Sequence, residues 1–137
     1  MRISIKATPD YHFEAKSENG SLLQVGASSS IGGDESGFRP MQLLLAAFGT
    51  CSAIDAVLIL KKGRVDFSHI DIEVDGDRKT GTPSPYETIR LRFIVHGKDV
   101  DLQKAERAVK LSVEKYCSVG ASLDPNIKIE VITEVAP

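Results

Sequence analysis

The segment Pro40–Lys62 constrains the fold of this chain more than any other, because it predicts one long helix that is apolar on every side. Its Leu, Ile, Val, Ala and Phe side chains point in all directions around a period of about 3.6 residues, so no broad face is left for water. Pro40 presets φ for the first turn, Lys61 and Lys62 suit the negative end of the helix dipole, and Gly63 ends the helix. We therefore expect a long central helix that is buried on all sides.

The same segment has the length of a membrane span, but its composition argues against insertion. Asp55 at mid-depth costs about 2.5 to 3.5 kcal/mol, whereas each large apolar side chain returns only about 0.3 to 0.6 kcal/mol. Gln42, Gly49, Thr50 and Ser52 reduce the gain further. The N-terminus MRISIKATPD also lacks the apolar core of a signal peptide. We therefore interpret the segment as the core helix of a protein with no membrane partner.

Charge and composition describe one ordinary soluble domain, which we expect to span residues 1–137. Seventeen basic and nineteen acidic residues leave a net charge of −2, and no run of basic residues occurs. Binding to nucleic acid or to an anionic membrane surface therefore has no electrostatic support. Two cysteines without a secretory signal indicate a reducing, cytoplasmic compartment, where a disulfide would be transient.

Period-two alternation predicts strands on both sides of the long helix, and the order of the elements predicts an α+β fold with antiparallel pairing as the default. Asn19-Gly20 is a hairpin signal, and a Ser/Gly-rich loop before Pro40 is interpreted as a plain connection. The predicted order is three strands, a helix, two strands, a helix and a strand, at residues 3–7, 12–15, 22–25, 40–62, 69–74, 86–96, 101–116 and 127–135.

A helix that is apolar on all sides needs more cover than one chain supplies. One amphipathic helix and one sheet cover about two of its sides. We therefore expect the remaining side to meet a second subunit in an obligate homodimer. Loops of the same chain are the alternative cover.

The two cysteines occupy different predicted elements: Cys51 lies in the middle of the long helix, and Cys117 directly follows the second helix. Cysteines in such a domain are commonly inert, small hydrophobic side chains. Burial lowers the thiolate fraction, an ionised Asp55 acts in the same direction, and Cys51 lies beyond the reach of the positive helix end. A reactive Cys51 therefore needs a cation from elsewhere in the fold or from the partner. Arg39 and Arg2 are candidates by residue type.

The three histidines, His12, His69 and His96, fall on or beside predicted strands without the local spacing typical of metal ligands. We therefore expect no metal site. A cysteine hydrolase or transferase would need one of them beside Cys51, which the sequence leaves open. For Asp55 we expect a structural hydrogen bond or ion pair.

Two segments, GFRPMQLLLAAFGTCSAIDAVLILKKGR and EKYCSVGASLDPNIKIEV, together resemble the OsmC/Ohr superfamily, which comprises osmotically inducible protein C and the organic hydroperoxide resistance proteins. The resemblance extends over most of the chain. It implies an OsmC-like fold and an intertwined homodimer, in which the two central helices pack together and each active site lies at the subunit interface.

The resemblance also implies a peroxiredoxin-like chemistry for the two cysteines. Cys51 would attack the O–O bond of an organic hydroperoxide as a thiolate and become a sulfenic acid. Cys117 would condense with it to a disulfide, and an external dithiol would reduce the pair. No metal or bound organic cofactor is needed.

The chain departs from the pattern of active members of this superfamily at two points. Those members carry a Glu ten residues before the reactive Cys, paired with an Arg from the N-terminal strands. Here that position is Met41, with Gln42 beside it, and residues 3–38 contain no Arg. The remaining candidates for supporting a thiolate are Arg39, Gln42 and Asp55.

The chain therefore resembles a less characterised branch of the superfamily, with a CSAID-type helix. Two functions stay open. One is thiol-dependent reduction of organic hydroperoxides in oxidative-stress defence. The other is a noncatalytic dimer that binds a small apolar ligand at the subunit interface.

Overall fold

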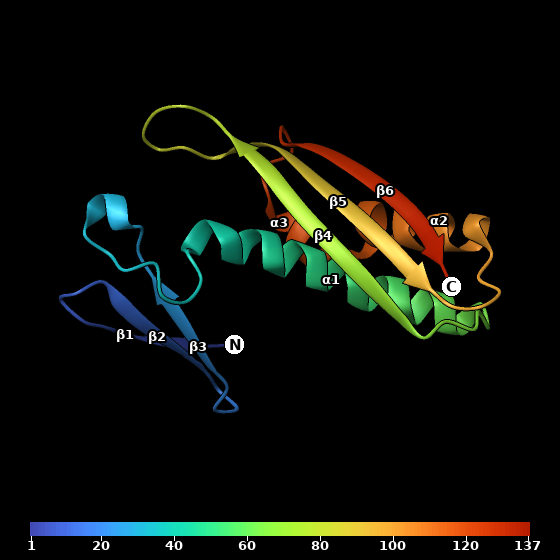
Figure 1. Cartoon of the computed structure of the whole chain (residues 1–137), viewed down its shortest axis with the longest axis horizontal. Coiled ribbons are helices and arrows are strands. Elements are labelled where there is room, and N and C mark those ends of the chain that lie inside the picture. Colours follow the sequence, from blue (N-terminus) through green and yellow to red (C-terminus); the bar gives the residue numbers. More distant parts are fainter. The chain divides into compact units, whose positions relative to one another are not determined.

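The computed structural model describes residues 1–137 and contains the helices and strands in the predicted order (Figure 1). It adds two short helices, and the last part of the helix predicted at residues 101–116 is a π-helical turn. The strands are β1 (Ile3–Ala7), β2 (His12–Ser17), β3 (Leu22–Gly26), β4 (His69–Arg78), β5 (Tyr86–His96) and β6 (Lys128–Ala136), and the helices are η1 (Ser29–Ile31), α1 (Pro40–Lys62), α2 (Leu102–Leu111), η2 (Ser112–Tyr116) and α3 (Ser118–Ser122).

The chain divides into two compact units, Met1–Leu44 and Leu45–Pro137, and the division falls inside α1. The expectation of a single domain stays a prediction. The first unit is the antiparallel meander β1-β2-β3. The predicted turn at Asn19-Gly20 joins β2 to β3, and Gly20 adopts a φ of 90°, which glycine tolerates without strain.

One face of the meander is apolar and exposed. In the pairing register, Ile5 lies opposite Ala15 and Ala15 lies opposite Leu23, so these side chains share a face. This face forms a hollow of about 580 Å³. Its main apolar lining residues are Ile3, Ile5, Phe13, Leu22, Leu23 and Val25.

The second unit contains the sheet β4-β5-β6, which is mixed rather than antiparallel. Strands β4 and β5 form an antiparallel hairpin, but β5 and β6 pair in parallel, with Ile89 opposite Ile129. The prediction of antiparallel pairing is therefore wrong for this pair. The chain crosses over through α2 before it returns to the sheet, and a crossover of this kind lets the next strand run parallel. Strand β4 also continues to Arg78, beyond its predicted end.

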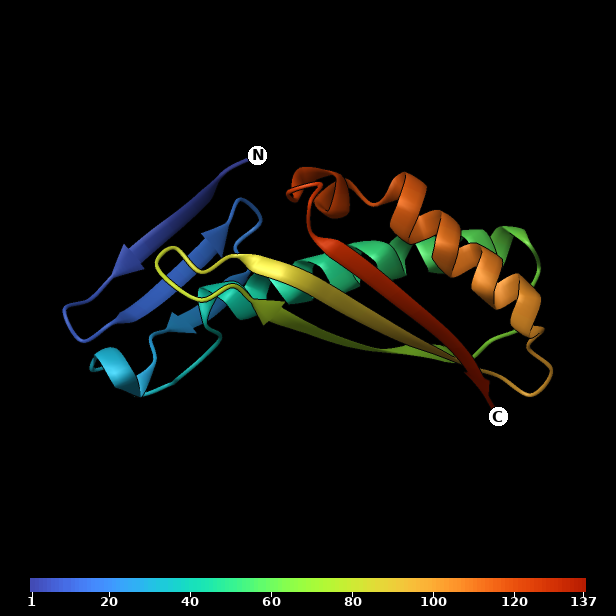
Figure 2. The same cartoon turned by 90° about the horizontal axis from the view of Figure 1, so that it is seen from above.

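Both long helices of the second unit lie on one face of this sheet. Figures 1 and 2 show α2 and the part of α1 in this unit on the same side of β4, β5 and β6. The inward residues of β5, among them Phe93 and Val95, are fully buried. Leu60 of α1 and Ala105 of α2 pack with Val95 in one core cluster. The opposite face of the sheet carries charged side chains and is described below.

Within one chain, helix α1 is buried along one stripe only, as expected of a helix that needs cover from a second subunit, and its burial on all sides stays a prediction. The stripe consists of Phe48, Ser52, Ala56 and Leu60, spaced four residues apart, together with Gly49. At Gly49 the helix approaches the sheet closely, because a Cβ there would lie 2.7 Å from Val74 Cγ2. A larger side chain would push α1 away from β4.

The other side of α1 is apolar and uncovered within one chain. Ile54 and Leu58 expose 64% and 51% of their surface. By length and composition α1 could also cross a membrane, since an 18-residue stretch of it has a mean hydropathy of 2.2, although 28% of that stretch is buried. The core helix of a soluble protein meets the same criteria.

We predict that Phe93→Ala destabilises the second unit by about 3 to 5 kcal/mol, because it empties the centre of the core between sheet and helices. The matched control is Phe38→Ala, since Phe38 is 46% exposed whereas Phe93 is fully buried. The control should change stability by less than about 1 kcal/mol. Urea unfolding at one fixed protein concentration measures both values. Equal losses for the two variants would contradict this assignment of the core.

Candidate active site

Cys117 lies at a junction between two irregular helical segments. Its N–H donates to the carbonyl of Ser112, five residues earlier, at 2.9 Å, which closes the π-helical turn η2. Helix α3 begins at the next residue, and the Cys117 Sγ accepts a hydrogen bond from the N–H of Gly120 at 3.3 Å. Gly120 therefore lies inside a short helix whose N-terminus is capped by the Cys117 sulfur.

Cys51 lies on α1 directly before the buried Ser52, at the flank of the buried stripe. Its side chain is half-buried. Ile54 and Leu58 follow three and seven positions later, so they share a helix face with Cys51. Cys51 therefore stands at the border between the core of its own unit and the uncovered apolar face of α1.

The fold brings the two thiols together. The Cys51 side chain lies close enough to that of Cys117 to influence its pKa, although the two residues come from elements far apart in the sequence. Cys117 is 4% exposed. Both cysteines are free thiols in this structure.

Burial is the main influence on Cys117, and it raises the pKa of this thiol. The Ser52 hydroxyl and the Gly120 N–H act in the opposite direction, and the adjacent Cys51 sulfur raises the Cys117 pKa further. Ser52 Oγ is fully buried and makes no hydrogen bond of ordinary geometry, so the Cys117 sulfur is its polar neighbour. None of these groups is a cation. Cys117 is therefore protonated at neutral pH.

A small hollow of about 260 Å³ adjoins Cys117. Gly120 keeps it open, since a Cβ at that position would lie 3.0 Å from the Phe48 ring and 3.6 Å from the Cys117 Sγ. The lining is mainly apolar and also includes Glu114 and Lys115. Its apolar lining residues are Phe48, Val113, Ala121, Ile129 and Val131.

The other predicted site residues have clear local positions. The Arg39 N–H donates to Gln42 Oε1 at 3.0 Å, so Gln42 caps the first turn of α1. The Arg39 guanidinium donates to the carbonyl of Glu35 at 3.0 Å. These contacts belong to the first unit, whereas Cys51 and the half-buried Asp55 belong to the second. A role for Arg39, Gln42 or Asp55 in supporting a thiolate stays a prediction.

The histidines do not form a Cys-His pair within the second unit. His69 and His96 lie on the face of the sheet opposite to that packed against α1, because their neighbours Ile70 and Val95 point into the core. His12 belongs to the first unit. The hydrolase or transferase alternative therefore has no support from His69 or His96.

Comparison with known proteins identifies the family. A family model described as OsmC-like protein matches residues 32–132, which is more than half of the chain. The chain belongs to the OsmC-like protein family.

Individual relatives of this OsmC-like protein agree with that assignment. Protein YhfA of Escherichia coli K12 is 36% identical over 135 residues, which cover 98% of both chains. A hypothetical protein from Aquifex aeolicus VF5 is 35% identical, with a TM-score of 0.85 and coverage of 98% of this chain and 95% of that one. An organic hydroperoxide resistance protein from Elizabethkingia anophelis shares the fold at 16% identity, with a TM-score of 0.75 and coverage of 99% and 97%. The OsmC-like fold is thus established.

Sequence reasoning missed Ser52 and Gly120 as neighbours of the Cys117 sulfur. A signal for Ser52 was present, because it is a polar residue on the same stripe of α1 as Phe48 and Ala56. A polar residue on a buried stripe points to a polar neighbour in the core. Gly120 carried no comparable signal, since the short helix α3 has no periodicity of its own.

We predict that iodoacetamide at pH 7 alkylates Cys51 well before Cys117 in the native protein. Cys117 is buried and its raised pKa leaves less thiolate than an ordinary thiol at that pH, so its rate should rise more steeply as the pH increases. Mass spectrometry of the two cysteine peptides follows both rates. The control is the urea-unfolded chain, in which both thiols should react at similar rates. Faster labelling of Cys117 in the native protein would contradict the described geometry.

Proposed function

We propose that this OsmC-like protein is a cytoplasmic, thiol-dependent oxidoreductase that reduces organic hydroperoxides, with Cys51 as the peroxidatic thiol and Cys117 as the resolving thiol. The observation that carries the proposal is the closeness of the two thiols. Family membership supports it, because organic hydroperoxide resistance proteins share this fold.

The proposed cycle transfers two electrons from an external dithiol to the peroxide. The Cys51 thiolate attacks one peroxide oxygen, the O–O bond breaks, and the alkoxide takes a proton and leaves as the alcohol. The Cys117 sulfur then attacks the Cys51 sulfenic acid, and the hydroxyl leaves as water with the proton of the Cys117 thiol. An external dithiol reduces the resulting disulfide by thiol-disulfide exchange and is itself oxidised.

The different surroundings of the two cysteines fit these two roles. The peroxidatic thiol must meet the substrate first, and within a single chain Cys51 is the more accessible of the pair. The resolving thiol must stay reduced until the sulfenic acid forms, and burial keeps Cys117 protonated and shielded. Cys117 also brings the proton that the departing hydroxyl needs.

Cys51 does not line the hollow beside Cys117, so in this proposal the hollow would receive only the organic substituent of a peroxide whose O–O bond lies at Cys51. Phe48, Val113, Ile129 and Val131 offer apolar surface to such a group. The volume of about 260 Å³ suits a small organic chain or ring.

One observation favours the noncatalytic alternative, a dimer that binds a small apolar ligand. The groups that act most strongly on the Cys117 thiol include no cation, and burial dominates. A thiol pair held in this way packs as small hydrophobic groups unless a positive charge reaches Cys51. Arg39 or a residue of the partner subunit would have to supply that charge in the catalytic alternative.

We also propose that the functional form is an intertwined homodimer. Ile54 and Leu58 leave a broad apolar face of α1 uncovered, and the meander of the first unit leaves a second apolar face exposed. A second copy of the chain would cover such faces with isologous contacts. Because Cys51 borders the face of α1, the dimer would place it at the subunit interface.

Replacement of each cysteine tests the catalytic proposal. With cumene hydroperoxide and a dithiol, Cys51→Ser should lower peroxide consumption to background. Cys117→Ser should still consume one equivalent and then hold Cys51 as a sulfenic acid, which dimedone traps. Wild-type protein oxidised by one equivalent should contain a Cys51–Cys117 disulfide, detected as a linked peptide by mass spectrometry.

The outcomes separate the two functions. Peroxide consumption that survives Cys51→Ser would exclude Cys51 as the peroxidatic residue. Absence of any intramolecular disulfide after oxidation, together with tight binding of an apolar ligand, would favour the noncatalytic dimer. Thr50→Ala serves as the control because Thr50 is the exposed neighbour of Cys51 and bonds only to carbonyls of its own helix.

We predict that Leu58→Glu converts the dimer to a monomer, because it places a charge on the apolar face of α1. Size-exclusion chromatography with light scattering measures the mass at micromolar concentration. Leu102→Glu is the matched control, since Leu102 is 43% exposed at the start of α2 and should leave the mass unchanged. A wild-type protein that is monomeric under these conditions would contradict the proposal. Circular dichroism confirms that both variants are folded.

A further inference from the structure

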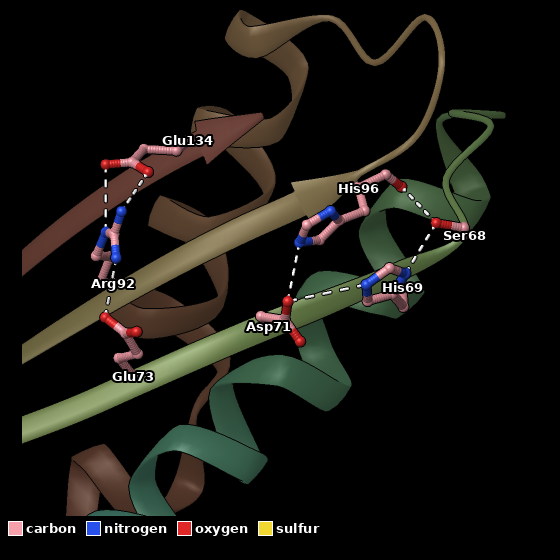
Figure 3. Close-up of polar contacts among 7 residues, drawn as sticks. All are labelled: Ser68, His69, Asp71, Glu73, Arg92, His96 and Glu134. Atoms are coloured by element: carbon pink, nitrogen blue, oxygen red, sulfur yellow. Dashed lines mark hydrogen bonds and ion pairs between the residues drawn. The ribbon is translucent and has the colours of Figure 1, made fainter. Parts of the chain in front are cut away.

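Two histidines and an aspartate meet on the outward face of the second unit's sheet, away from the thiols (Figure 3). His69 lies opposite His96 in the antiparallel register of β4 and β5. Asp71 follows His69 by two residues and therefore points to the same face. Asp71 Oδ2 lies 2.9 Å from His96 Nε2 and 3.8 Å from His69 Nε2.

These three side chains offer a set of metal ligands. One ligand atom from each of His69, Asp71 and His96 lies within 4.8 Å of the others. Ligands bound to Zn²⁺ at about 2.0 to 2.1 Å with tetrahedral angles stand about 3.3 Å apart. The distances from Asp71 Oδ2 to the two Nε2 atoms, 2.9 Å and 3.8 Å, lie on either side of this value. Shifts of a few tenths of an ångström would bring each of these two distances to it.

The imidazole rings of His69 and His96 stack, with centroids 4.1 Å apart and an angle of 6° between their planes. Because imidazole lone pairs lie in the ring plane and the two planes are nearly parallel, at least one ring must turn through a large angle before both Nε2 lone pairs point at one ion. The freedom for this lies with His69 and Asp71, whose side chains are 57% and 60% exposed. His96 is 20% exposed and provides the fixed side of the site.

Ser68 orients the His69 ring. Its Oγ donates to the carbonyl of His96 at 3.2 Å and lies 2.9 Å from His69 Nδ1. When the single hydroxyl proton points at the carbonyl, Oγ can accept from an Nδ1–H of His69, which is the tautomer that a metal ion at Nε2 requires. The neutral ring then carries its free lone pair on Nε2, which faces Asp71. Metal-binding histidines commonly have their second nitrogen held in this way.

Among the outward carboxylates of β4, Asp71 is the one without an arginine partner. Arg92 binds Glu73 at 3.0 Å and Glu134 at 2.8 Å, as Figure 3 shows. Arg90 binds the carboxylates of the next two outward positions of β4, Asp75 and Asp77.

Asp71 faces only the two imidazoles. His96 Nε2 is shielded from solvent and, despite its closeness to Asp71, has no hydrogen bond of ordinary geometry. A cation between these groups would satisfy both the carboxylate and this nitrogen.

We propose that His69, Asp71 and His96 form a binding site for Zn²⁺, with a fourth position open to water or to a ligand from another molecule. Two imidazole nitrogens and one carboxylate suit this ion. The local spacing of the histidines in the sequence gave no sign of the site, because the pairing of β4 with β5 creates it. The ion would tie the start of β4 to the end of β5.

Calorimetric titration of the full-length, tag-free protein with ZnCl₂ tests the proposal. We expect one ion per chain. Asp71→Asn and His96→Asn should each weaken binding at least tenfold, and Ser68→Ala should weaken it about 10-fold to 100-fold through loss of ring orientation. Zinc should raise the thermal unfolding midpoint of the wild type but not that of Asp71→Asn.

Two controls distinguish this site from other zinc ligands in the chain. His12→Asn should bind normally, because His12 Nε2 pairs with Asp34 at 2.9 Å in the first unit. The double variant Cys51→Ser/Cys117→Ser should also bind normally. Loss of binding in the cysteine variant with full binding in His96→Asn would move the ion to the thiols and overturn the proposal. No heat of binding and no shift in the unfolding midpoint at 100 µM zinc would also overturn it. Asp71 is a surface residue, so its variant keeps the test valid if His96→Asn does not fold.

Discussion

The packing of one stripe of α1 against the sheet of the second unit is the interaction on which the rest of the structure depends. Phe48, Ser52, Ala56 and Leu60 repeat every four residues, so they meet the sheet along a single line. Gly49 permits a close approach to Val74. This contact fixes the rotation of the helix about its axis. The rotation in turn decides that Cys51 stands at the flank of the stripe.

The candidate active site follows from this rotation combined with the route of the chain after α2. The π-helical turn η2 delivers Cys117 to the sulfur of Cys51, and Gly120 leaves room for the Phe48 ring beside it. Apart from the Gly120 N–H beside the Cys117 sulfur, neither cysteine gains an unusual environment from its own local sequence. Cys51 becomes half-buried and Cys117 buried only when the elements pack together. This difference in burial matches the peroxidatic and resolving roles that the proposed chemistry requires.

Element types were predictable from the sequence because they depend on local periodicity, and the cysteine contexts of Cys51 and Cys117 identified the family. The parallel pairing of β5 with β6 was not predictable from local periodicity, since it depends on the crossover through α2. The incomplete burial of α1 within one chain was predictable in kind, because its apolar surface exceeds what one sheet and one helix can cover, but the stripe that is buried was not. The meeting of His69 with His96 depends on strand register, which no spacing along the chain encodes.

The backbone at Cys51 is anchored more firmly than the backbone at Cys117, which adjoins the short helix α3. Cys51 belongs to a helix of 23 residues anchored along its whole buried stripe, whereas Cys117 adjoins a helix of five residues with no fully buried side chain. When two sulfurs pass from contact to a covalent bond and back, one backbone must yield. The compliant partner is the segment that starts at Cys117, so each turnover would flex a surface turn and leave the hydrophobic interior undisturbed.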